Sequence, residues 1–112
     1  MDRISTMLLN IGITPDLKGF EYIKEGVVLI IAKKTGHLSV TKELYPDIAE
    51  IAGTTASRVE RCIRYVKEKA ISRDHGEIQK TIGISPYSTK LSNSQFMHCI
   101  AYKIKSENAQ EE

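Results

Sequence analysis

The stretch LYPDIAEIAGTTASRVERCIRYVKEK, residues Leu44 to Lys69, decides the fold of this chain. Gly53 separates two segments whose apolar residues recur at helical spacing, and two threonines follow it. Glycine is the usual residue in the tight turn between two helices that cross at a large angle. The stretch therefore predicts a helix-turn-helix whose second helix covers about residues 55–71.

Four residues fall where a helix-turn-helix needs small or apolar side chains. Counted from Tyr45 as the first position, the fifth, ninth, fifteenth and eighteenth positions hold Ala49, Gly53, Val59 and Cys62. Helical hairpins that bind nothing share this pattern, so the pattern alone leaves the function open.

The polar side of the second helix carries the candidate DNA-binding residues. At about 100° of turn per residue, one wide face lies opposite the apolar stripe. This face consists of Ser57, Glu60, Arg61, Arg64 and Lys67, with Arg58 at its edge. Arginine can donate two hydrogen bonds to guanine, and glutamate can accept one from cytosine. Arg58, Glu60 and Arg61 are therefore suited to reading bases in the major groove.

Other polar residues of the second helix are candidates for phosphate contacts, and several of them have a second interpretation. The candidates are Thr54, Thr55, Ser57, Arg64 and Lys67. Free N–H groups at the start of a helix can bind phosphate, but Thr54 or Thr55 can equally be a simple N-cap. Glu60 can likewise form a solvent-exposed pair with Arg64 one turn later.

The distribution of charge supports a polyanionic partner. The 112 residues have a net charge of only +2, but residues 54–73 contain six basic and two acidic side chains, a local charge of +4. The remaining residues therefore sum to −2. Such a cluster suits nucleic acid, although a basic helix face exposed to solvent is the plainer alternative.

The rest of the chain predicts an all-α protein, a compact bundle of about six helices. Apolar spacing indicates helices over residues 3–11, 15–34, 46–52, 55–71, 74–82 and 93–105. Thr14 and Pro15 are expected to open the second of these, Gly36 to end it, and Asp74 and Glu77 to form a capping box. Residues 1–106 are expected to be one domain, and residues 107–112 a disordered tail.

Several classes of protein are not expected. The longest apolar run, Gly26 to Ala32, is too short to span a membrane, and no signal peptide is evident, so a cytoplasmic location is expected. Cys62 and Cys99 are expected to be buried free thiols. No metal site, cofactor or enzyme activity is expected, because no ligand spacing, phosphate loop or catalytic constellation is present.

The motif TTASRVERCIRY, residues 54–65, resembles the DNA-binding effector domain of the sporulation initiation response regulator, the master transcription factor of sporulation in endospore-forming Firmicutes. The resemblance continues through GITPDLKGFEYIKEGV, SVTKELYPDIAE and NSQFMHCIAYKI, and covers about residues 3–106. It implies a six-helix fold and a sequence-specific regulator of transcription that binds double-stranded DNA at a box with a TGTCG core. It also implies that Arg58, Glu60 and Arg61 read bases.

The same resemblance implies partners beyond DNA. Residues 74–84 would correspond to a surface that contacts an RNA polymerase sigma factor, although they match only loosely. Regulators of this family carry a phosphorylatable receiver domain, and this sequence begins almost directly at the effector domain. Tight binding to paired sites, as a homodimer on DNA, would then come from another interface or from contacts templated by the DNA, or would not occur. An alternative function is a protein-interaction module or antagonist that binds a sigma factor or a related regulator.

Overall fold

The computed structural model describes residues 2–33, 40–87 and 90–111, and these residues form helices without any strand. The elements are α1 (Arg3–Asn10), α2 (Lys18–Ala32), a short π-helix η1 (Val40–Leu44), α3 (Tyr45–Ala52), α4 (Ala56–Ser72), α5 (Glu77–Ile82) and α6 (Asn93–Glu111). The predicted all-α bundle is confirmed. None of the described helices is long and apolar enough to cross a membrane.

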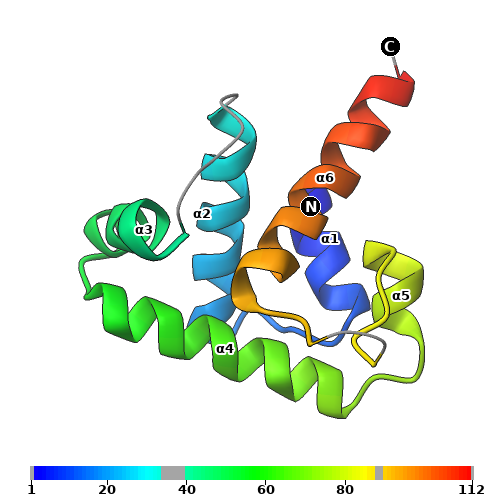
Figure 1. Cartoon of the computed structure of the whole chain (residues 1–112), viewed down its shortest axis with the longest axis horizontal. Coiled ribbons are helices and arrows are strands. Elements are labelled where there is room, and N and C mark those ends of the chain that lie inside the picture. The colour runs from blue at the N-terminus through cyan, green and yellow to red at the C-terminus, as the bar shows by residue number, and fades with distance from the viewer. Residues whose placement is uncertain (1, 34–39, 88–89, 112) are drawn as a thin grey trace.

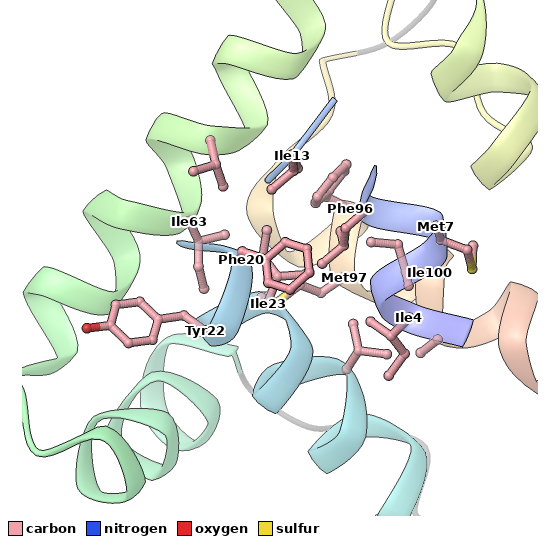
Figure 2. Packing of buried hydrophobic residues seen from close by; sticks show 14 of the residues in the cluster. Ile4, Met7, Ile13, Phe20, Tyr22, Ile23, Ile63, Phe96, Met97 and Ile100 are labelled. Atoms are coloured by element: carbon pink, nitrogen blue, oxygen red, sulfur yellow. The ribbon is translucent and has the colours of Figure 1, made fainter. Parts of the chain in front are cut away.

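Helix α2 lies at the centre of the packing and contacts α1, α3, α4 and α6. In Figure 1, α4 runs beneath the ends of both α2 and α6. Figure 2 shows Phe20 and Ile23 of α2 among Ile63 of α4 and Phe96 of α6, and all four are almost completely buried. Because this core backs one side of α4, it fixes which side of that helix reaches solvent.

Gly19 allows α2 and α4 to approach closely. A Cβ atom at this position would lie 2.5 Å from the carbonyl oxygen of Cys62 and 2.7 Å from Cγ2 of Val66. Real Cβ atoms do not approach other atoms so closely, so only glycine fits without moving one of the helices. The backbone of α2 therefore sets the position of the middle of α4.

The predicted start of α2 is wrong by three residues. The helix begins at Lys18 after an extended Leu17, and the backbone N–H of Leu17 donates to the carbonyl of Thr14 at 3.2 Å. Proline is favoured at the second position of such a turn as well as at the first position of a helix. Thr14 and Pro15 therefore form a turn and do not cap the helix. Gly36 lies outside the described residues.

The predicted capping box of Asp74 and Glu77 does not form, and α5 begins at Glu77, three residues after the predicted start. The carboxylate of Asp74 accepts from the N–H of Ile78 at 2.9 Å, and that of Glu77 accepts from the N–H of His75 at 2.6 Å. Gly76, in a left-handed conformation with φ 105°, occupies the N-cap itself. Helix α6 continues to Glu111, through most of the predicted tail; the domain boundary at residue 106 and the disorder of 107–112 stay predictions.

Candidate nucleic-acid interface

A tight turn at Gly53 joins α3 to α4. Gly53 has φ 69° and ψ 39°, a left-handed conformation that glycine adopts without strain. The N–H of Thr54 donates to the carbonyl of Ala49 at 2.9 Å and closes the end of α3. The hydroxyl oxygen of Thr55 then accepts from the N–H of Arg58 at 3.2 Å, so Thr55 is the N-cap of α4. The predicted helix-turn-helix is confirmed.

The two sides of α4 are divided as predicted along its first half. Val59 and Ile63 are buried, whereas Ser57, Arg58 and Arg61 are exposed. The side chains of Arg58 and Arg61 form no ion pair with any described residue. Their guanidinium groups are therefore available to a ligand, together with the backbone N–H groups at the start of the helix.

Glu60 and Arg64 form the ion pair that the sequence allowed. The distance from Arg64 Nε to Glu60 Oε1 is 3.5 Å, and half of the Arg64 side chain remains exposed. A solvent-exposed pair one helical turn apart contributes only about 0.3–0.5 kcal/mol. DNA could therefore compete for either partner at little cost.

Lys67 does not share the exposure of its neighbours, and the prediction that it lies on the exposed face is wrong. Only 7% of its surface is accessible, and burial lowers the pKa of its amine. The helical angle placed it near Arg64, but burial also depends on the elements that pack around α4, which the angle could not reveal. Lys67 therefore belongs to the packed half of α4.

Two hollows flank the exposed side of α4, and Arg61 lines both. The α3-side hollow, about 570 Å³, is lined by Tyr45, Ala56, Ser57, Glu60, Arg61 and Arg64. The α2-side hollow, about 400 Å³, is lined by Leu17, Lys18, Gly19, Arg58, Arg61, Cys62, Tyr65 and Val66. The three predicted base-reading residues therefore lie together at these hollows, and Lys18 and Tyr65 join them. Nothing in the helical spacing of α4 pointed to Lys18, because it comes from α2.

Asn93, which sequence reasoning also missed, ties α6 to the helix-turn-helix. Its Nδ2 donates to the hydroxyl of Tyr45 at 3.0 Å and to the carbonyl of Glu60 at 3.3 Å. A carbonyl can only accept, so the amide nitrogen must face Glu60. Burial raises the pKa of Tyr45, which keeps this phenol neutral. The pair of bonds holds α3 and the first half of α4 in a fixed relation.

The two cysteines and the possible metal ligands form no second candidate site among the described residues. Cys62 and Cys99 are free but half-buried, so the expectation of fully buried thiols is wrong. Within the described part of the chain, no three side chains of histidine, cysteine, aspartate or glutamate gather in a way that could hold a metal ion. The cationic surface of α4 is therefore the strongest candidate site.

Comparison with known protein families agrees with this site. The family model for the C-terminal domain of the sporulation initiation factor Spo0A matches residues 4–104. The match spans α1 to α5 and most of α6, including the whole helix-turn-helix. The resemblance found in the sequence motifs is thereby confirmed.

Proposed function

The chain belongs to the family of Spo0A C-terminal domains, DNA-binding effector domains of a sporulation transcription factor, and from this premise we propose that it reads a specific duplex sequence with α4 in the major groove. One observation carries the proposal: Arg58, Glu60 and Arg61 lie together near the N-terminal end of α4, at hollows open to solvent. Recognition helices contact base edges from this part of the helix.

The three side chains have complementary roles in this proposal. Arg58 and Arg61 would each donate to the O6 and N7 atoms of a guanine, and Glu60 would accept from the N4 amine of a cytosine. Each good contact discriminates against a wrong base by about 1–3 kcal/mol. A box with a TGTCG core offers guanines and a cytosine within a few base pairs, which suits this set.

Phosphate contacts would fix the register of α4 on the duplex. Thr54 and Ser57 flank the start of the helix, where the positive end of the helix dipole favours an anion. Arg64 lies one turn beyond Glu60 and is half exposed. The hydroxyl of Thr55 already accepts a bond as the N-cap, so its contact would come from the neighbouring N–H groups. We leave Lys67 out of the interface because it is buried.

Further expectations stay proposals. A homodimer on DNA would place two copies of α4 on successive half-sites. A sigma-factor contact at residues 74–84 would use polar side chains, because Ile78 and Ile82 are both buried. If DNA showed no sequence preference, this protein-binding role would become the leading alternative.

Single-base competition tests the assignment of the three readers. Each base pair of the box is replaced in turn, and the affinity for each duplex is measured with the wild type and with Arg58→Ala, Glu60→Ala and Arg61→Ala. We expect each variant to become indifferent to one or two particular base pairs, with a loss of about 1–3 kcal/mol on the intact box. Uniform losses on all duplexes would contradict direct readout. Thermal unfolding of each variant excludes misfolding as the cause.

A further inference from the structure

The two hollows beside α4 differ in charge. The α2-side hollow has three cationic side chains in its lining, Lys18, Arg58 and Arg61, and no acidic one. The α3-side hollow includes the carboxylate of Glu60. Glu60 would weaken the attraction of a phosphate to Arg61 and Arg64 in that hollow, whereas no acidic side chain in the lining of the α2-side hollow opposes Lys18 and Arg58. This difference in charge suits the α3-side hollow to a base edge and the α2-side hollow to the DNA backbone.

We propose that the α2-side hollow binds one phosphodiester of the DNA backbone, with Lys18 contacting the phosphate and Arg58 adding positive charge beside it while it donates to its guanine. This inference rests on the proposed placement of α4 in the major groove. That groove is about 12 Å wide and is bounded by a sugar-phosphate backbone on each side. Arg61 lines both hollows, so the hollows lie on either side of its side chain. In this placement the α3-side hollow would face the base edges on the floor of the groove, and the α2-side hollow would face one of the two bounding strands.

The remaining lining of the hollow suits the sugar that accompanies the phosphate. The half-buried Leu17 provides apolar surface, and Tyr65 is 58% exposed beside it. Lys69 lies over the ring of Tyr65, with its Nζ 5.8 Å from the ring centroid, and adds a further positive charge beside the hollow.

Lys18→Gln tests this site because Lys18 is exposed and comes from outside the helix-turn-helix. The affinities of the wild type and the variant for the box and for a scrambled duplex are measured over a series of salt concentrations. We expect Lys18→Gln to weaken both by the same factor, about 3- to 10-fold, and to reduce the slope of log K against log salt by about 0.9, the value for one lost phosphate contact. Lys105→Gln, the same change at an exposed position of α6, should leave both quantities unchanged.

A duplex with one uncharged methylphosphonate locates the phosphate. The group is placed at each position of each strand in turn. At one position it should lower the affinity of the wild type but should not lower the affinity of Lys18→Gln any further. Lys18→Arg should behave as the wild type. A wild-type slope in Lys18→Gln, or a loss confined to the box, would overturn the phosphate assignment while leaving the proposed function intact. Failure of the wild type to prefer the box would instead overturn the proposed function.

Discussion

The two halves of α4 share one helical pattern but differ in what covers them. In the first half, Ser57, Arg58 and Arg61 are exposed beside two hollows. In the second half, Lys67 and Ala70 are buried. The comparison teaches that periodicity gives the direction of a side chain, whereas availability to a ligand depends on elements from elsewhere in the chain. Lys67, which the helical spacing places on the polar face, is therefore not available to DNA, although Tyr65 and Glu68 beside it are exposed.

Gly19→Ala should have the largest effect, because Gly19 packs where the two halves of α4 meet. The added Cβ would lie 2.5 Å from the backbone oxygen of Cys62, which can yield only if α2 and α4 separate. We expect the free energy of unfolding in urea to fall by about 3 kcal/mol.

Gly12→Ala is the control for Gly19→Ala. Its site is open but has φ 91°, so the left-handed backbone alone should cost about 1–2 kcal/mol. Equal losses in the two variants would contradict the close approach of α2 and α4 as the reason for Gly19.

Asn93→Ala should loosen the first half of α4 specifically. It removes the bonds to the Tyr45 hydroxyl and the Glu60 carbonyl. We expect a loss of about 1–2 kcal/mol in the free energy of unfolding, and a smaller preference for the box at temperatures where the variant is fully folded. Tyr45→Phe removes one of the two bonds, and in the double variant its effect should not add to that of Asn93→Ala. Full additivity would show that the network does not act as a unit.

Asp2 lies outside both halves of α4, because it is the N-cap of α1, and therefore serves as a reference for stability effects that do not involve α4. The hydrogen bond from the backbone of Ser5 holds the pKa of Asp2 at about 2, below the usual 3.8. A carboxyl with a lowered pKa stabilises the folded state above its unfolded pKa, and this stabilisation is lost as the pH falls through the folded value. Because 53% of the side chain is exposed, we expect only about 1 kcal/mol.

Urea unfolding of the wild type and Asp2→Ala between pH 6 and pH 2 measures this contribution. The difference in the free energy of unfolding between the two proteins should be largest above about pH 4 and shrink toward zero near pH 2. Preference for the box at pH 7 should be the same in both. A difference in stability that does not change with pH would contradict the role assigned to the charge.

Lys67→Met should have the smallest effect on DNA binding. Because Lys67 is buried, we expect the salt slope of binding to match that of the wild type. Arg64→Met, one turn earlier and half exposed, should reduce the slope by about 0.9. A reduced slope in Lys67→Met would show that its amine reaches phosphate and would erase the contrast between the two halves.

The helix-turn-helix was predicted correctly because each of its sequence signals depends only on nearby residues. Gly53 is required by its own backbone conformation, Thr55 caps the helix that follows it, and Val59 and Ile63 follow helical spacing. The start of α2 was misplaced because Pro15 suits a turn as well as a helix. These cases depend on a few adjacent residues, whose preferences are visible in the sequence.

Contacts between distant segments could not be predicted in this way. Lys67 was misjudged because its burial depends on how other elements pack around α4, and Asn93 looked like any polar residue at the start of a helix. Lys18 was missed because its place beside Arg58 follows from the packing of α2 on α4. The residues proposed to read bases were thus evident in the sequence, whereas the residues that hold them in place were not.

Fluorescence anisotropy with two labelled duplexes tests the central claim most directly. One duplex contains a box with the TGTCG core and the other a scrambled sequence of the same composition, and both are titrated at several salt concentrations. We expect the box to bind at least about tenfold more tightly, a difference of about 1.4 kcal/mol, at every salt concentration. Equal affinities for the two duplexes would contradict a reading role for the first half of α4.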